Sequence, residues 1–170
     1  MVHVASPLAT KVKHEREIID PAVNGTRAVL EACEKYKIER LIITSSGLAV
    51  MDPYKLGEKT SFNESDFLEP RKQTPAYDKS KVMAEKLAWD FHSKLPKESR
   101  FDLIVLCPGL IVGPFLVKAP NETASLVTKL MTGKLPGCPR VMVPWVDVRD
   151  VAVAHLKAVD SKPNERYVIV

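Results

Sequence analysis

The sequence is short of glycine, cysteine and aromatic residues. Its 170 residues include 7 glycines and 3 cysteines, and aromatic residues make up 6%. None of the glycines is spaced as G-x-G-x-x-G or G-x-x-G-x-x-G, so the sequence has no Gly-rich turn of the kind that binds a pyrophosphate at a helix N-terminus. No apolar run approaches the roughly 20 residues that span a bilayer. These absences exclude a Gly-rich phosphate site and a membrane-spanning helix within this sequence.

The cysteines are an odd number at wide spacing, at Cys33, Cys107 and Cys138. The sequence does not open with a signal-peptide pattern, so we expect reduced thiols in a cytoplasmic protein. The four histidines are scattered, and no Cys or His pair has metal-ligand spacing. We therefore predict no metal site.

Neither sign of charge dominates the sequence. Lysine and arginine number 25 against 21 aspartates and glutamates, which gives a net charge of +4, and the two signs are interspersed. The densest basic run, at 11–16, is interrupted by Val12 and Glu15 and is typical of a solvated approach to a helix. This pattern argues against a nucleic-acid-binding protein. The hydrophobic fraction of 45% and the charged fraction of 27% are typical of one globular domain with a core.

Short β-branched runs alternate with longer helical patterns, which predicts a parallel sheet with crossover helices. A long loop is expected at 51–75, which is rich in Pro, Gly, Ser and charge, and an irregular connection follows Pro108. The first helix is expected to start with Asp20 as N-cap and Pro21 at its first position, and to end near Tyr36. The other elements expected are strands at 2–5, 39–46, 101–107, 141–143 and 166–170, and helices at 75–95, 122–132 and 147–160.

Tyr77 and Lys81 are the strongest chemical pair in the sequence. Residues four apart on a helix share a face. A phenol titrates near pKa ~10, and a cation held beside it lowers that pKa by stabilising the phenolate. The pair could therefore act as a general acid. A Tyr-x-x-x-Lys spacing is weak support by itself, because ordinary helix surfaces produce many such matches.

The strand at 39–46 ends in Thr44, Ser45 and Ser46. In a doubly wound sheet the carboxyl ends of the strands face the ligand crevice. A serine hydroxyl there can donate a hydrogen bond to a substrate carbonyl oxygen while Tyr77 delivers a proton. At least one of the two serines is expected only to cap the turn.

Six motifs in this sequence resemble, in family order, the extended short-chain dehydrogenase/reductases of the NAD-dependent epimerase/dehydratase superfamily. Within that superfamily they are most similar to the dihydroflavonol and cinnamoyl-CoA reductase branch. Together they extend over nearly the whole chain, which makes them far more specific than any single one. The motifs are HVASP at 3–7, PAVNGT at 21–26, TSS at 44–46, YDKSK at 77–81, PGLIVGP at 108–114 and WVDVRDVA at 145–152.

The resemblance implies catalytic roles for three matched positions. Ser46 corresponds to the catalytic hydroxyl, with Ser45 as the alternative. Tyr77 corresponds to the proton donor, and Lys81 to the residue that lowers the Tyr77 pKa and bonds the nicotinamide ribose.

The resemblance also implies binding of NADP, with NAD as the alternative, and of a small-molecule carbonyl substrate. Ala5 and Ser6 are similar to a loop that passes beside the cofactor. The implied cofactor-binding residues are Ala5, Ser6, Thr44, Ser45, Tyr77, Lys81, Pro108, Gly109, Leu110 and Ile111.

Two features depart from the family pattern. Cys107 stands where the family usually has an arginine, and we expect it to pack under the sheet. The Gly-rich turn of the family is also absent. We therefore expect an α/β fold, a partial Rossmann-like doubly wound parallel sheet of order 3-2-1-4-5-6 without strands 1 to 3. Residues 1–170 would be the C-terminal portion of a larger domain. We expect that domain to be truncated before the strand at 2–5 and, since a strand ends at Val170, after Val170 as well.

Three functions remain open. The first is an NADP(H)-dependent oxidoreductase that reduces a ketone or aldehyde by hydride transfer; as a fragment it would be inactive alone and would bind the cofactor poorly. The second is a non-catalytic truncated homologue that binds partners through its open sheet edge. The third is a nucleotide-sugar epimerase or dehydratase, which the sequence SGLAVMDP at 46–53 favours less, because it is more similar to the reductase branch.

The strand at 2–5 would lie at the edge of such a sheet, where unpaired backbone groups promote association. We therefore expect this polypeptide to self-associate through residues 2–5 or to be marginally stable. Analytical ultracentrifugation combined with thermal melting tests this expectation. A monomer that melts cooperatively would contradict it.

Overall fold

The computed structural model describes residues 1–8, 12–52, 55, 59–116, 122–135, 137 and 143–170. Cys138 and most of the strand expected at 141–143 lie outside these residues. The elements are β1 (Val2–His3), α1 (Arg16–Lys35), β2 (Arg40–Thr44), η1 (Gly47–Ala49), α2 (Ala76–Lys94), η3 (Lys97–Ser99), β3 (Asp102–Pro108), β4 (Leu110–Val112), α3 (Glu122–Met131), β5 (Trp145–Asp147), α4 (Val148–Val159) and β6 (Arg166–Ile169), where η marks a short 3₁₀ helix.

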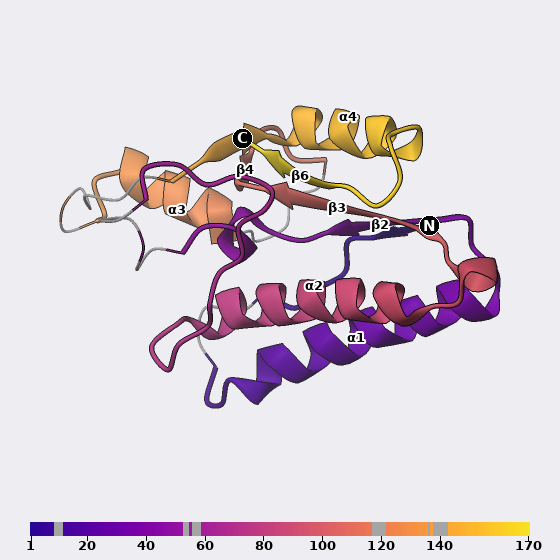
Figure 1. The fold of residues 1–170 in the computed structure, drawn as a ribbon. Helices are drawn as coiled ribbons and strands as arrows, with labels where there is room; N and C mark the ends of the chain where they lie inside the picture. Colours follow the sequence, from indigo (N-terminus) through magenta and orange to yellow (C-terminus); the bar gives the residue numbers. More distant parts are fainter. Residues whose placement is uncertain (9–11, 53–54, 56–58, 117–121, 136, 138–142) are drawn as a thin grey trace.

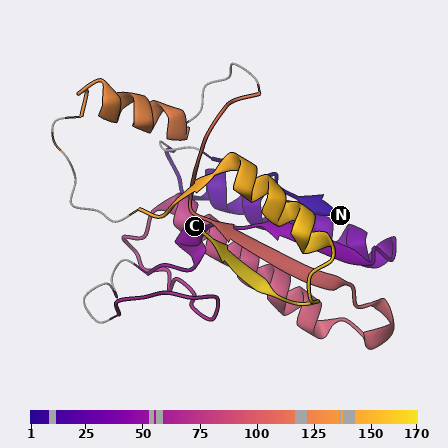
Figure 2. The same ribbon diagram turned by 90° about the horizontal axis from the view of Figure 1, so that it is seen from above.

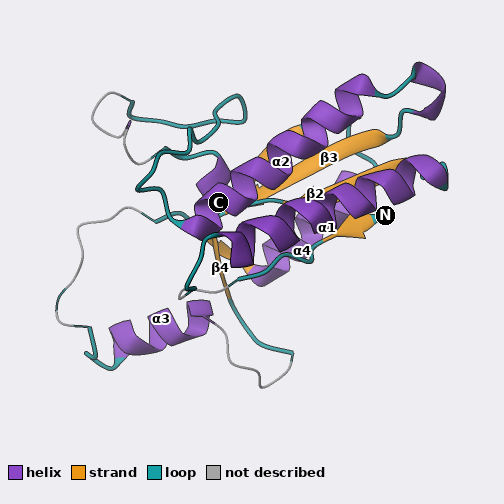
Figure 3. Ribbon diagram, turned by 90° about the horizontal axis from the view of Figure 1, so that it is seen from below, coloured by secondary structure: helices purple, strands orange, loops and turns teal. Residues whose placement is uncertain are grey.

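Four strands form a parallel sheet in the order β1-β2-β3-β6. Figures 1 and 3 show α1 and α2 side by side on one face of this sheet, and Figure 2 shows α4 lying across the other face. The predicted parallel sheet with helices on both faces is confirmed. Because the strands are parallel, all of their carboxyl ends lie at one edge of the sheet.

The core alternates between the two faces of the sheet with the period of two that a strand imposes. Residues 41, 43, 103, 105 and 107 pack with Leu30 and Cys33 of α1 and Ala88 of α2. Residues 42, 104 and 106 pack with Ala158 of α4. The central strands therefore read as continuous apolar runs because both of their faces are covered.

The strands at 2–5 and 39–46 are shorter than predicted. β1 ends at His3, and the side chain of Val4 is 60% exposed. β2 ends at Thr44, since Ser46 instead caps the 3₁₀ helix η1, its hydroxyl accepting a hydrogen bond from the Leu48 N–H. The strand therefore ends at Thr44, and Ser45 and Ser46 lie in the turn that follows it.

The predicted start of the first helix was wrong. The helix begins at Arg16, and Pro21 lies inside it rather than at its first position. Backbone bonds from Glu17 and Ile18 to preceding carbonyls already form the first turn. Pro21 removes a single helical donor. Ile18, which is 1% exposed, anchors the added turn in the core.

A second sheet of two strands was not predicted. β4 pairs in parallel with β5, so that Leu110 lies opposite Trp145 where an irregular connection was expected. Gly109 makes this approach possible, because a Cβ there would lie 2.5 Å from the Pro144 carbonyl oxygen.

In the described ranges, none of the helices has the length and the apolar character that a membrane span requires.

We expect Leu103→Ala to lower the free energy of unfolding by about 2–5 kcal/mol, because it opens a cavity in the central strand. Leu103 is completely buried. Leu156→Ala is the matched control, since Leu156 is 70% exposed, and it should change stability by about 0.5 kcal/mol or less. Urea unfolding measures both variants. Equal losses would contradict the packing described here.

Candidate active site

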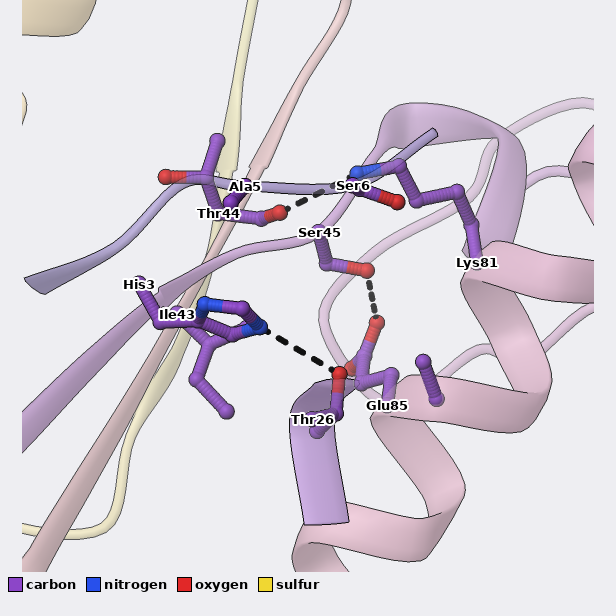
Figure 4. A pocket seen from close by; sticks show the side chains of 10 residues that line it. His3, Ala5, Ser6, Thr26, Ile43, Thr44, Ser45, Lys81 and Glu85 are labelled. Carbon is purple, nitrogen blue, oxygen red and sulfur yellow. Dashed lines mark hydrogen bonds between the residues drawn. The ribbon is translucent and has the colours of Figure 1, made fainter. Parts of the chain in front are cut away.

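The residues that follow β1 and β2 meet residues of α1 and α2 at the carboxyl edge of the sheet. Figure 4 shows a small pocket there, with a volume of about 20 Å³, which is room for one water molecule. Ala5 and Ser6 also border a wider, open hollow of about 590 Å³ beside α1. The small pocket is lined by His3, Ala5, Ser6, Thr26, Ile43, Thr44, Ser45, Lys81, Ala84 and Glu85.

Lys81 projects from α2 to the end of β2. Its ammonium donates to the Thr44 carbonyl oxygen at 3.3 Å and lies 5.8 Å from the centroid of the Tyr77 ring. The residue is 8% exposed, and burial lowers its pKa, while Glu85 opposes this shift. An ammonium has three donors. The bond to Thr44 uses one of them and leaves two for other acceptors.

Tyr77 lies one turn before Lys81 on α2, with its phenol against Ser46. Burial raises the pKa of Tyr77 and Asp78 raises it further, while the hydrogen bond with the Ser46 side chain lowers it. The phenol therefore stays protonated at neutral pH, which is the state that a proton donor needs. The lowering effect expected from Lys81 is not among the causes of this shift, so it stays a prediction.

The two serines after β2 have different partners. The Ser45 hydroxyl is buried and donates to Glu85 Oε2 at 2.5 Å. The Ser46 hydroxyl accepts from the Leu48 N–H at 3.2 Å and contacts Tyr77. The Ser45 hydrogen is therefore committed to a carboxylate, whereas Ser46 lies beside the phenol. This difference favours Ser46 as the chemically active hydroxyl.

A buried ion pair beneath these residues was missed by the sequence reasoning. Arg166 Nε lies 2.5 Å from Glu85 Oε1, and the two side chains are 5% and 1% exposed. Glu85 also accepts from the indole of Trp89 at 3.3 Å. A signal was present, because Tyr77, Lys81 and Glu85 recur every fourth residue and so share one face of the helix.

The model of the NAD dependent epimerase/dehydratase family matches residues 1–169. The chain belongs to this family.

Individual relatives place the chain in the branch of cinnamoyl-CoA reductases and dihydroflavonol reductase-like enzymes. It is 35% identical to a cinnamoyl-CoA reductase of Medicago truncatula, over 94% of this chain and 49% of that protein. It is 34% identical to the NADPH-dependent methylglyoxal reductase of Saccharomyces cerevisiae, over 95% of this chain and 52% of that protein. The chain thus spans about half the length of the curated relatives it matches.

The fold is similar to that of the yeast methylglyoxal/isovaleraldehyde reductase solved with NADPH. The TM-score is 0.87 at 32% identity, over 99% of this chain and 55% of that structure. The α/β parallel sheet of this family member therefore matches a Rossmann-like reductase over about half its length.

The motif after β3 lies beside the turn after β2. Pro108 ends β3, Gly109 follows it, and Leu110 and Ile111 begin β4. A Cβ on Gly47 would lie 3.3 Å from the Pro108 carbonyl oxygen. The structure therefore brings this motif against the turn of Ser46, although none of its residues lines the small pocket.

Cys107 is fully buried under the sheet, as expected, with its thiol 3.7 Å from Glu85 Oε2. Burial, reinforced by the Glu85 carboxylate, raises the pKa of this thiol to about 12. Because the thiolate is the reactive form, Cys107 is an inert packing residue.

Two histidines near the site were not singled out from the sequence. His155 Nδ1 donates to the Val151 carbonyl at 2.8 Å, because a carbonyl oxygen can only accept, and Nε2 lies 2.7 Å from the Thr44 hydroxyl. His3 Nε2 lies 3.4 Å from Thr26 Oγ1, and burial and then Lys81 lower the pKa of His3. Thr44 is thus held from both faces of the sheet, by Lys81 and by His155.

No group of three or more His, Cys, Asp or Glu side chains that could hold a metal occurs among the residues that the model describes.

We expect Lys81→Met to change how stability depends on pH. The pKa of Lys81 is lowered from 10.5 in the folded chain. At a pH between the lowered pKa and 10.5, Lys81 is therefore protonated in the unfolded chain and has released its proton in the folded chain. The free energy of unfolding of the wild type should therefore rise, relative to the Met variant, as the pH increases from the lowered pKa of Lys81 toward 10.5.

Urea unfolding at several pH values measures this difference. Lys157→Met is the matched control, since it removes an exposed lysine from a helix. The prediction fails if the two variants differ from the wild type by the same amount at every pH.

Proposed function

We propose that this chain supplies the catalytic and substrate-binding part of an NADP(H)-dependent reductase that converts a small-molecule ketone or aldehyde into an alcohol. The observation that carries the proposal is the meeting of Ser46, Tyr77 and Lys81 at the carboxyl edge of a parallel sheet. The motif order and the half-length match support residues 1–170 as the C-terminal portion of such an enzyme, with strands 1 to 3 in the half that is not matched.

In the proposed reaction the Ser46 hydroxyl donates a hydrogen bond to the substrate carbonyl oxygen and polarises it. The Tyr77 phenol, which is protonated at neutral pH, delivers its proton to that oxygen as the alcohol forms. Lys81 then stabilises the phenolate electrostatically from its position beside the ring. Bound NADPH would supply the hydride to the carbonyl carbon.

The residues present fit only one end of this cofactor. The Lys81 ammonium retains two donors for ribose hydroxyls, and Ala5 and Ser6 border a hollow large enough for a small molecule. Pro108 to Ile111 would lie alongside the nicotinamide. The sequence has no Gly-rich turn for the pyrophosphate and no identified residue that distinguishes NADP from NAD. We therefore expect residues 1–170 alone to bind NADPH weakly and to be inactive.

A second candidate is a non-catalytic homologue that binds a partner through its sheet edge. β1 is an edge strand of the described sheet, and its first residue, Val2, is 51% exposed. An unpaired apolar strand of this kind can pair with another chain. The sequence keeps Ser46, Tyr77 and Lys81, and the fold brings them together, which favours the reductase. The cytosol, where reduced thiols persist, is the proposed location for either function.

We expect Tyr77→Phe to reduce kcat about 100-fold or more, because it removes the proton donor and leaves the ring in place. The enzyme tested is the longest natural polypeptide that contains residues 1–170. NADPH oxidation is followed by absorbance with methylglyoxal and isovaleraldehyde as substrates, and NADPH affinity is followed by fluorescence.

Tyr36→Phe is the matched control, since Tyr36 is 68% exposed at the end of α1 and should keep the wild-type rate. Near-normal turnover by Tyr77→Phe would exclude the assignment of the proton donor. A wild type that binds a partner protein but reduces no carbonyl would favour the second candidate.

A further inference from the structure

The Glu85–Arg166 pair contacts the chain on both sides of Ser46. We call residues 45–50 the Ser46 turn. On one side of Ser46, the Ser45 hydroxyl donates to Glu85 Oε2 at 2.5 Å. On the other side, the Ala49 carbonyl accepts from Arg166 Nη2 at 3.4 Å. One ion pair thus holds both ends of the turn that carries the proposed catalytic hydroxyl.

The ion pair is itself held rigidly. Arg166 Nη1 donates to the carbonyls of Glu64 and Asp66, and its guanidinium stacks 3.9 Å from the centroid of the Phe67 ring. All five guanidinium donors are directional, so these bonds fix the plane of the group. The anchors of the Ser46 turn therefore cannot shift without breaking a buried network.

Backbone contacts also confine the Ser46 turn. Gly47 packs against the backbone of Pro108 and Gly109, and the Leu68 N–H donates to the Ala49 carbonyl at 2.9 Å. Within the turn the Ala49 N–H donates to the Ser46 carbonyl at 2.9 Å. The Ser46 hydroxyl therefore has a defined position relative to α2, and with it to Tyr77.

We propose that Glu85 and Arg166 are positioning residues, which tie Ser45 and Ala49 and so hold the Ser46 hydroxyl at the Tyr77 phenol. This inference rests on the proposed function, in which Ser46 polarises the carbonyl. Glu85 and Arg166 do not contact the reacting atoms. They act through Ser45 and the Ala49 carbonyl, and small displacements of a catalytic group carry large losses in rate.

Ser45→Ala separates this role from a merely structural one. It removes the bond between the Ser46 turn and Glu85 while leaving the Glu85–Arg166 bonds intact. Glu85→Gln disrupts the ion pair itself. Asp102→Asn is the matched control, because it removes the negative charge from the 2.8 Å ion pair with Arg40 at the opposite end of β2.

We expect kcat to fall about tenfold or more in Ser45→Ala and Glu85→Gln, while the KM and the affinity for NADPH stay within about twofold of the wild type. Asp102→Asn should keep the wild-type kcat. These rates are measured in the longest natural polypeptide that contains residues 1–170, with the carbonyl substrates named above.

Hydrogen exchange of the amides of Ala49, Val50 and Met51 supplies a readout that needs no activity. These amides donate to carbonyls inside the turn. We expect faster exchange of this segment in Ser45→Ala and Glu85→Gln than in the wild type, and no change in Asp102→Asn. Mass spectrometry of peptides that contain residues 48–51 measures the exchange.

The two readouts keep the two proposals distinct. A wild type without carbonyl reductase activity overturns the proposed function. In that case hydrogen exchange alone tests whether Glu85 and Arg166 position the Ser46 turn, and unchanged exchange in Ser45→Ala overturns that role. If the wild type is active, a wild-type kcat in Ser45→Ala overturns the positioning role and leaves the proposed function standing. If Glu85→Gln does not fold, Ser45→Ala decides alone.

Discussion

The buried salt bridge between Glu85 and Arg166 is the constraint on which the site depends. It joins the middle of α2 to the first residue of β6, and it reaches the loop that carries Glu64 and Asp66. Removing one partner of such a pair costs about 3–5 kcal/mol, because the other charge is left buried without compensation. A hydrophobic replacement of both partners could pack as well, but it would not donate to backbone carbonyls or accept from Ser45. The pair therefore provides directional anchors as well as cohesion.

The parallel sheet determines where those anchors act. Because β1, β2 and β3 run in the same direction, the residues that follow each of them lie at one edge of the sheet, where Lys81 of α2 reaches the end of β2. Helices on both faces leave the central strands apolar throughout. Polar side chains are thus concentrated at the strand ends, where they can contact a bound substrate and take part in the proposed reaction.

Local patterns predicted much of the fold and part of the site. The helix predicted at 75–95 from its periodicity is observed at 76–94, and the strand predicted at 101–107 from a continuous apolar run is observed at 102–108. The shared face of Tyr77 and Lys81 followed from their spacing. The start of α1 was missed because Pro21 resembles a first-position proline, whereas the burial of Ile18 extends the helix by a turn. The pairing of β4 with β5 was missed because two three-residue segments far apart in sequence carry no local signal.

The sequence by itself determined the family, the parallel sheet and the candidates Ser46, Tyr77 and Lys81, because motif order and hydrophobic periodicity are properties of neighbouring residues. Only the tertiary structure decided which of the two serine hydroxyls donates to a buried carboxylate, since the acceptor, Glu85, is 40 residues away from Ser45. It also decided that Arg166, 81 residues from Glu85, completes the buried pair. Such partners are selected by the packing of α2 against one face of the sheet, and no local spacing encodes that packing.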